Sequence, residues 1–142
     1  MPSFTAGIPN IRAIGPVVQI QIAISEAAEQ ALKKAGQPVP PPVQVSAMID
    51  TGASDSVIQT GIAQQLGIQP IGVTRVNTPS STNVQCYRYD VQLILPNGVT
   101  VVVPVTEAPL QGQHIQCLIG RDILMHGVFI YIGYSNLFSF SV

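Results

Sequence analysis

The sequence predicts a mainly β, closed or nearly closed barrel-like domain with a few short helices. Three observations carry this prediction. Several segments alternate apolar and polar residues with the period of a half-buried strand. The Pro96–Gly98 turn, which contains Asn-Gly, separates two such segments and is a strong hairpin signal. The chain length of 142 residues suits one domain, so we expect a single domain over residues 1–142.

The first clear strand is Val17–Ile24, which places Val and Ile side chains on one face and Gln19 and Gln21 on the other. A short helix over Glu26–Ala35 follows, with Ser25 as its N-cap. Residues 37–42 (QPVPPP) form a stiff, extended connector. We therefore expect residues 1–42 to be an N-terminal extension and residues 43–142 to be the core.

The later elements are predicted from apolar runs bounded by turn residues. The expected strands are Val43–Ile49, Val84–Leu95, Val99–Val105, Ile115–Ile119, Val128–Gly133 and Leu137–Val142. The expected short helices are Gly61–Leu66 and Arg121–Met125. Counted together, the chain should hold about eight or nine strands and two or three helices, which pack as a closed β domain.

Charged residues are scarce, and this excludes several partners. They make up 9% of the chain, six basic and seven acidic, where an average protein has about 25%. So few cations do not build a phosphate-binding patch, so no nucleic-acid partner is expected. No apolar run is long enough for a membrane helix. An apolar chain with so little charge predicts that a second subunit covers part of its surface.

The cysteines and histidines give no sign of a metal site or a disulfide scaffold. Cys86 and Cys117 are the only cysteines, and together with His114 they do not supply a convincing set of three or four ligands. The N-terminus lacks the basic start and apolar core of a signal peptide. We therefore expect no metal, no cofactor and a reducing compartment, the cytoplasm.

One segment departs from the strand pattern, because an ionisable residue ends an apolar strand. Ala47–Ile49 runs directly into Asp50-Thr51-Gly52. A buried carboxylate is costly unless it is paired or hydrogen-bonded, and the glycine permits a tight turn. Alone, such a triplet is also explained by an Asp that caps a loop. A second string later in the chain, Leu118–Asp122, favours a functional site.

Together, Asp50-Thr51-Gly52-Ala53-Ser54 and Leu118-Ile119-Gly120-Arg121-Asp122 resemble the retropepsin-like aspartic proteases. This family includes retroviral, retrotransposon and bacterial single-lobe enzymes. The resemblance covers Val43–Val142, and the segment between the two strings matches in general pattern only. It implies the single-lobe closed β-barrel of that family and an aspartic endopeptidase that cleaves peptide substrates.

The resemblance also implies a homodimer. Aspartic proteases need two adjacent carboxylates, which share a proton because two like charges about 3 Å apart do not both ionise easily. One carboxylate activates a water as general base, and the other protonates the substrate carbonyl. The chain has one Asp-[Ser/Thr]-Gly triplet and is too short for two lobes. Each subunit of a two-fold dimer would therefore supply Asp50.

The resemblance assigns roles to three groups of residues. The catalytic residues are Asp50, Thr51 and Gly52. The substrate-binding residues are Gly52, Ser54, Asp55, Thr78, Ser80 and Ser81. The residues of structural support are Gly120, Arg121 and Asp122. Within the catalytic group, Thr51 would brace the two loops across the two-fold axis.

The expected flap lies near Val76–Tyr87 and would close over an extended peptide through strand-like hydrogen bonds. Retroviral flaps are rich in glycine, whereas this chain has none between Gly72 and Gly98. Pro79–Asn83 must therefore turn without glycine, and Asn83 is suited to a left-handed position.

Two further departures concern the loop and the dimer sheet. Ser54 stands where retroviral enzymes usually have an acidic residue paired with the arginine that matches Arg121. Asp55 or Asp122 is expected to pair with Arg121 instead, and Asp55 is equally suited to substrate contact or to a turn. Retroviral dimer sheets interleave both chain ends. Here Leu137–Val142 is suited to that role, and the role of residues 1–10 stays open.

Two other hypotheses stand beside the protease. The same fold can serve as a catalytically silent dimerisation or peptide-binding module, which the unusual flap and Ser54 favour. The triplet can also be incidental in a structural β domain. A serine nucleophile is unsupported, because Ser54 and Ser56 have no adjacent base.

Overall fold

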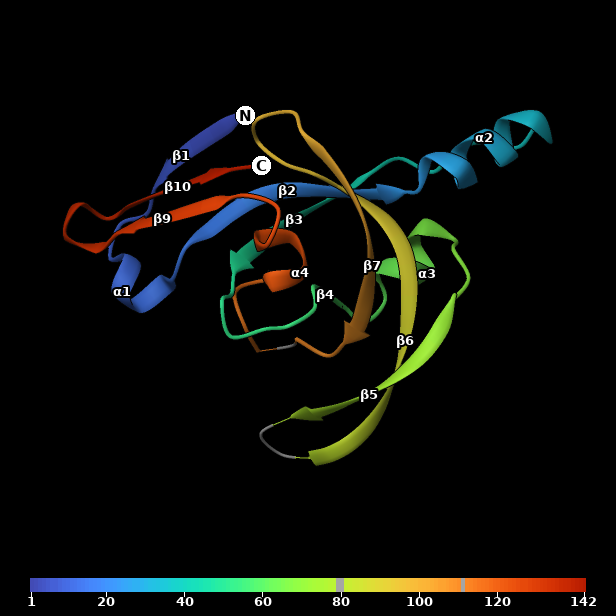
Figure 1. Cartoon of the computed structure of the whole chain (residues 1–142). Coiled ribbons are helices and arrows are strands. Elements are labelled where there is room, and N and C mark those ends of the chain that lie inside the picture. Colours follow the sequence, from blue (N-terminus) through green and yellow to red (C-terminus); the bar gives the residue numbers. More distant parts are fainter. Residues whose placement is uncertain (79–80, 111) are drawn as a thin grey trace.

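Strands dominate the computed structural model, which describes residues 1–78, 81–110 and 112–142 (Figure 1). The strands are β1 (Ser3–Gly7), β2 (Val17–Ile24), β3 (Val43–Ile49), β4 (Val57–Gln59), β5 (Gly72–Thr78), β6 (Ser81–Ile94), β7 (Thr100–Ala108), β8 (Cys117–Ile119), β9 (Val128–Ile132) and β10 (Leu137–Ser141). The helices are α1 (Ile11–Ile14), α2 (Glu26–Lys34), α3 (Ile62–Leu66) and α4 (Arg121–Leu124), with a 3-10 helix η1 (Gly133–Ser135).

The larger sheet closes on itself. Its strand order is β2-β3-β8-β4-β7-β6-β5, and an additional β2–β6 pairing joins the two sides and leaves β5 outside the ring. The β3–β8 and β4–β7 pairs are parallel, and the other pairs in the sheet are antiparallel. The ring is not a regular barrel, because β4 and β8 have only three residues each. The predicted mainly β, closed fold class is confirmed.

Strand β2 shows why the sequence pattern produces this ring. Its Val and Ile residues at alternate positions are buried, whereas Gln19 and Gln21 are exposed. The buried face meets the inner faces of β3 and β6, where Val45 and Leu93 are also buried. Burying this apolar surface is the main stabilising contribution that the ring receives.

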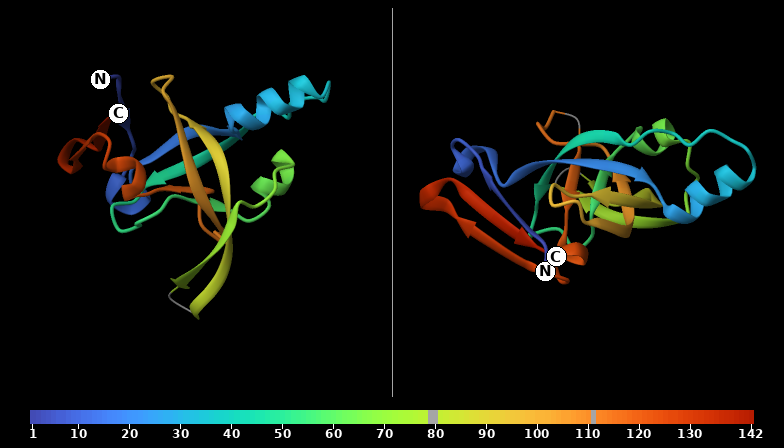
Figure 2. Two further views of the ribbon diagram at one scale, coloured as in Figure 1. Left: turned by 45° about the vertical axis from the view of Figure 1, so that its right-hand side comes forward. Right: turned by 90° about the horizontal axis from the view of Figure 1, so that it is seen from above.

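A second sheet, in the order β1-β10-β9, joins the two ends of the chain. Phe4 of β1 lies opposite Phe140 of β10, and its ring makes edge contacts with Phe138 and Phe140 at centroid distances of 6.2 and 6.1 Å. Phe138 and Phe140 are fully buried in the common core. The chain ends therefore lie side by side at one edge of the molecule (Figure 2).

Helix α2 leaves the ring after β2 and extends from it (Figure 1). The predicted N-cap is confirmed, because the Ser25 hydroxyl accepts a hydrogen bond of 3.2 Å from the amide of Ala28. One ion pair, Lys33 to Glu29 at 3.0 Å, lies along its exposed side. Among the described residues, no helix is long and apolar enough to cross a membrane.

Several short elements go beyond the sequence expectation, namely β1, α1, β4 and β5. The segment treated as an N-terminal extension also supplies β2, which is part of the ring, and β1, which pairs with β10. The turn expected at residues 96–98 is present, and a second turn precedes β10. Gly98 and Asn136 take left-handed φ angles of 81° and 53° there.

The buried Cys117 thiol predicts a loss of stability at alkaline pH. Desolvation, with a smaller contribution from the negative charge of Asp122, raises the pKa of Cys117 from 9.0 to about 12. Above pH 9 the unfolded chain releases this proton while the folded chain retains it. The free energy of unfolding should therefore fall by roughly 1 kcal/mol for each pH unit between 9 and 12.

Urea unfolding at several pH values measures this effect. Cys117→Ala should be less stable than wild type at neutral pH, because it leaves a cavity, but its stability should fall less steeply above pH 9. Parallel pH profiles for the two proteins would contradict the assignment.

Candidate functional site

The two motif strings lie side by side because β3 and β8 are parallel neighbours. Ile49, the last residue of β3, lies opposite Ile119, the last residue of β8. The amide of Asp50 then donates a 2.9 Å hydrogen bond to the carbonyl of Ile119. Asp50 is partly buried. Its carboxyl group therefore lies at the boundary of the core, one residue after the buried end of β3.

The Asp50 loop, residues 50–56, folds back on its own first residue. The amide of Gly52 donates a 2.8 Å hydrogen bond to Oδ1 of Asp50, and the amide of Ala53 donates to the Asp50 carbonyl at 3.2 Å. Among the described residues, the Gly52 amide is the only group that bonds this carboxylate. One carboxylate oxygen is thus oriented, and the other keeps its capacity to accept or hold a proton.

The start of α4 holds the outer part of this loop. Nη1 of Arg121 donates to the carbonyl of Thr51 at 2.7 Å, and the Arg121 amide donates to the carbonyl of Ala53 at 2.8 Å. The amide of Asp122 donates to the carbonyl of Ser54 at 3.1 Å. The first amides of a helix have no partner inside the helix, so here the loop satisfies them while they fix its path.

A buried hydroxyl and a carboxylate lock the inner part of the loop. Ser56 is fully buried, and its hydroxyl donates to Oδ1 of Asp122 at 2.8 Å while it accepts a 3.0 Å bond from the Gly120 amide. The Ser56 amide donates to Oδ2 of Asp122 at 2.9 Å. Both Asp122 oxygens are therefore bonded, which compensates for the desolvation of a carboxylate next to the core.

Gly120 is required because the loop backbone presses against it. A Cβ at this position would lie 2.8 Å from the carbonyl carbon and oxygen of Asp55 and 3.0 Å from the carbonyl oxygen of Ala53. These neighbours are backbone atoms and do not move independently. The close approach lets the loop and the β8–α4 junction share one hydrogen-bond network.

The structure gives Arg121 a partner that differs from the expected one. Within the described ranges, neither Asp55 nor Asp122 forms an ion pair with Arg121. Asp122 is occupied by Ser56, and the exposed Asp55 accepts a hydrogen bond of 3.4 Å from the Ser54 hydroxyl. Arg121 instead bonds the Thr51 carbonyl. Sequence reasoning missed Ser56, whose signal is a single small hydroxyl residue immediately before the apolar Val57-Ile58.

The predicted flap residues belong to the β5–β6 hairpin, which projects from the ring (Figure 1). Thr78 lies opposite Ser81 in the strand register, and Ser80 lies outside the described residues. Asn83 takes the expected left-handed conformation, with φ 57°. Its amide donates to Oδ1 of Asn77 at 2.9 Å, and its carbonyl accepts from Arg75 at 3.2 Å. The side chains of Asn77 and Arg75 thus hold the backbone of Asn83 in place.

The remaining candidate ligands are dispersed. Nε2 of His114 lies 2.9 Å from the carbonyl of Ile14, and Cys86 and Cys117 are both buried free thiols. Among the residues that the structure describes, no three His, Cys, Asp or Glu side chains are grouped as metal ligands.

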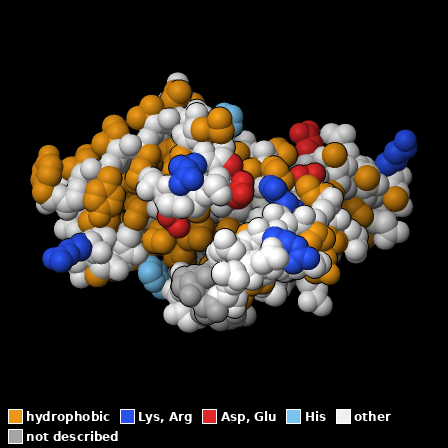
Figure 3. All heavy atoms as spheres, turned by 60° about the horizontal axis from the view of Figure 1, so that its bottom comes forward, with side chains coloured by type: hydrophobic (Ala, Val, Ile, Leu, Met, Phe, Trp, Pro, Cys, Tyr) orange, Lys and Arg blue, Asp and Glu red, His pale blue; other side chains and the backbone are white. Residues whose placement is uncertain are grey.

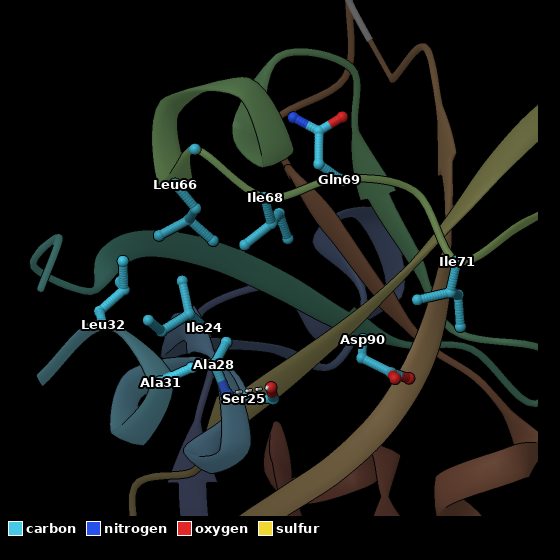
Figure 4. Close-up of a pocket in the computed structure, with 11 residues that line it drawn as sticks. Ile24, Ser25, Ala28, Ala31, Leu32, Leu66, Ile68, Gln69, Ile71 and Asp90 are labelled. Carbon is cyan, nitrogen blue, oxygen red and sulfur yellow. Dashed lines mark hydrogen bonds between the residues drawn. The ribbon is translucent and has the colours of Figure 1, made fainter. Parts of the chain in front are cut away.

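A hollow of about 400 Å³ lies apart from the Asp50 loop. Figure 4 shows Ile24 and Leu32 on one side of it, Leu66 and Ile68 on the other, and Asp90 at one end. No residue of the Asp50 loop lines this hollow. The hollow therefore belongs to the junction of α2 with the segment after α3 and not to the carboxylate site.

The Ser56–Asp122 network generates a prediction about stability. Ser56→Ala leaves the buried Gly120 amide without its partner and removes one of the two hydrogen bonds to Oδ1 of Asp122, which keeps the Ile123 amide at 2.9 Å. The free energy of unfolding should fall by about 1–3 kcal/mol, the cost of unsatisfied buried groups. Ser54→Ala is the matched control, because Ser54 is exposed, and its effect should stay within about 0.5 kcal/mol. Equal effects of the two variants in urea titrations would contradict the role of Ser56.

Two of the solved structures that share this fold are proteases. A retropepsin-like aspartic protease from Rickettsia conorii superposes with a TM-score of 0.62 at 14% sequence identity, covering 97% of this chain and 89% of that one. EIAV protease in complex with the inhibitor HBY-793 superposes with a TM-score of 0.53 at 19% identity, covering 78% and 86%. At these identities the likeness concerns the fold, and it confirms that the fold is retropepsin-like. No curated protein matches the chain.

The sequence itself matches a family model described as aspartyl protease over residues 32–123. The match covers more than half of the chain and includes both Asp50-Thr51-Gly52 and Gly120-Arg121-Asp122. The resemblance inferred from these two strings is thereby confirmed. This chain belongs to the aspartyl protease family.

Proposed function

We propose that the chain is an aspartic endopeptidase that works as a homodimer, with Asp50 from each subunit in one active site. The observation that carries the proposal is the position of Asp50 at the end of a buried strand, where the Gly52 amide orients one of its carboxylate oxygens. The chain holds only one Asp-[Ser/Thr]-Gly triplet, so a second carboxylate of this kind has to come from a second copy. Family membership supports a hydrolase in general. The dimer and the role of Asp50 are specific to this proposal.

The chemistry requires the two carboxylates to lie close together. Mutual repulsion keeps one of them protonated. The ionised carboxylate removes a proton from a water molecule, which attacks the peptide carbonyl, and the protonated carboxyl donates to the carbonyl oxygen. Any titration of this site belongs to the pair and not to one Asp50. The Gly52 amide keeps each Oδ1 oriented throughout.

The residues around Asp50 then divide into two roles. Thr51 is exposed, which suits a hydroxyl that braces the partner loop, while its carbonyl stays bonded to Arg121. Arg121 and Asp122 are positioning residues, because they contact the loop and not the carboxylate. Gly52, Ser54 and Asp55 are exposed on the loop and are proposed to contact substrate.

The β5–β6 hairpin is proposed as the flap. An extended peptide beneath it would form strand-like hydrogen bonds with its backbone, with Thr78, Ser80 and Ser81 as contact residues. The side chains of Asn77 and Arg75 hold the backbone of Asn83, and closure would occur through bending of the whole hairpin. Closing a hairpin over the substrate excludes water from the site.

The proposal also covers the domain organisation, the partners and the compartment. Residues 1–142 would act as one domain, since β1 and β2 pair with strands of the core. The partners would be a second copy of the chain and a protein or peptide substrate, with no nucleic acid and no membrane. Neither a metal nor a cofactor enters the reaction, and the compartment would be the cytoplasm.

A catalytically silent dimerisation or peptide-binding module is the alternative. The hairpin turn without glycine and the exposed Ser54 favour it, because both differ from the retroviral pattern. A dimer that fails to cut a diverse peptide library from acidic to neutral pH would support this alternative and contradict the protease.

Asp50→Asn tests the proposed reaction directly. An amide cannot act as the general base, so cleavage of a library peptide should fall about a thousandfold or more, while the solution mass stays unchanged. The matched control is Asp90→Asn, because Asp90 is exposed on β6 away from the loop and should retain wild-type activity. Peptidase activity that survives Asp50→Asn would exclude the mechanism.

A further inference from the structure

A second hollow, of about 360 Å³, lies at the base of the β5–β6 hairpin, and we name it the Glu107 pocket. Residues of β6 and β7 line one part of it, and residues around α3 line the rest. Its acidic, aromatic and amide side chains are Glu107, Tyr87, Tyr89, Gln64 and Gln69. No residue of the Asp50 loop lines it, so it is separate from the proposed active site.

The sheet register places the acidic and aromatic side chains on one face. Tyr89 of β6 lies directly opposite Val105 of β7. Because these strands are antiparallel, Tyr87 and Glu107 lie two positions beyond this pair in the same direction. Side chains two positions apart on a strand share a face. The two tyrosines and the carboxylate therefore lie together on the side of the sheet that lines the pocket.

Glu107 has no basic partner among the described residues, in which the one ion pair joins Lys33 to Glu29. Its Oε2 accepts a long hydrogen bond of 3.4 Å from the amide of Gly61, and its Oε1 accepts none from the described groups. Charged side chains are few and dispersed on the face that Figure 3 shows. A half-buried carboxylate with unused acceptor capacity favours a cationic ligand.

The two tyrosines supply the second feature of a cation site. Tyr87 is 48% exposed, whereas Tyr89 is buried, so the pocket extends from a solvent-facing ring to a sheltered one. Burial, and after it the negative charge of Glu107, raises the pKa of the Tyr89 hydroxyl. This effect agrees with the shared face that the register predicts. Aromatic rings attract ammonium and guanidinium groups that lie over their faces.

The amides on the other side of the pocket favour a guanidinium over an ammonium group. Figure 4 shows the Gln69 side chain directed away from Ile24 and Leu32 of the α2 hollow, and Gln69 also lines the Glu107 pocket together with Gln64. Their amide oxygens are additional acceptors. A guanidinium group has five N–H donors in a plane, pairs with a carboxylate through two of them and stacks on aromatic rings.

We propose that the Glu107 pocket binds an alkylguanidinium group. Glu107 accepts its N–H donors, the rings of Tyr87 and Tyr89 contact its plane and its alkyl chain, and the glutamine amides accept the remaining donors. The group comes from a free small molecule or from an arginine side chain of another protein. Binding at this pocket does not involve Asp50, so the site is a function in addition to the proposed peptidase.

NMR titration of protein with labelled tyrosine rings tests the site. Of the four tyrosines, Tyr87 and Tyr89 line the pocket, whereas Tyr131 and Tyr134 belong to β9 and η1. N-butylguanidinium should shift the ring signals of the first two and leave those of the other two unchanged. A ligand of about eight non-hydrogen atoms binds with a Kd on the order of 1 mM. N-butylurea is the matched control ligand, because it has the same shape without the charge, and it should cause no shift.

Two matched carboxylate variants test the role of charge. Glu107→Gln keeps the side-chain shape and should raise the Kd for N-butylguanidinium at least about tenfold, because hydrogen bonds to a charged group are lost. Asp90→Asn removes one charge from the opposite face of β6, and Asp90 does not line the pocket. Its Kd should stay within about twofold of wild type, since salt screens distant charges. Circular dichroism checks that each variant is folded.

A second pair of variants tests the aromatic contact independently of Glu107. Tyr87→Leu should raise the Kd about two- to fivefold, because the cation–π contact is lost. Tyr87→Phe retains the ring and should bind nearly as wild type does. Equal effects of these two variants would contradict a contact between the cation and the ring.

Two blocked tripeptides distinguish the sources of the group, one with a central arginine and one with a central glutamine. If the arginine peptide binds as tightly as N-butylguanidinium and the glutamine peptide does not bind, a protein side chain is the ligand. If N-butylguanidinium binds and neither peptide does, the ligand is a free small molecule. Absent shifts of Tyr87 and Tyr89, equal shifts with N-butylurea, or an unchanged Kd in Glu107→Gln would each overturn the proposal.

Discussion

The parallel pairing of β3 with β8 is the constraint on which the rest of the site depends. It places Ile49 opposite Ile119 and so brings Asp50 next to a glycine and a helix start that lie far along the chain. Parallel neighbours need a long crossover connection, and residues 50–116 supply it. The β5–β6 hairpin and β7 are built within that crossover, so the pairing that creates the carboxylate site also positions the proposed flap.

The hydrogen-bond network around Ser56 converts this pairing into a rigid loop. The amides of Arg121 and Asp122 and the Arg121 side chain donate to loop carbonyls, and each Asp122 oxygen accepts a hydrogen bond from Ser56. The carboxylate of Asp50 receives only the Gly52 amide among the described groups. The loop is thus fixed by residues other than the one proposed to react, which leaves Asp50 available for a proton, a water molecule and a second carboxylate.

The sequence alone predicts those features of the fold that depend on residues close together in the chain. The alternation in β2, the Ser25 cap and the turn at Gly98 depend on neighbours in sequence, and all three were predictable. Strand β1 was not, because Ser3–Gly7 is short and of mixed polarity, and its partner β10 is at the other end of the chain. The same reason hid the Ser56–Asp122 bond, which joins residues 66 positions apart. Arg121 was expected to form an ion pair with a carboxylate, but Asp122 is hydrogen-bonded to Ser56 and Arg121 bonds the Thr51 carbonyl.

The structure shows where the segments without charged side chains lie. The segments at both ends of the chain carry no charged side chains and form one sheet, and its apolar β9 edge follows helix α4, which holds the Asp50 loop. An exposed apolar edge strand of this kind favours contact with another chain.

The central claim is that two Asp50 residues, one from each chain, form one active site. Subunit mixing tests it most directly: wild-type chains are equilibrated with an equal amount of Asp50→Asn chains, and total peptidase activity is compared with that of the same wild-type chains alone. Random pairing leaves half of the wild-type chains in fully wild-type dimers, so activity should fall to about half. Activity that is unchanged by the added inactive chains would contradict the shared site.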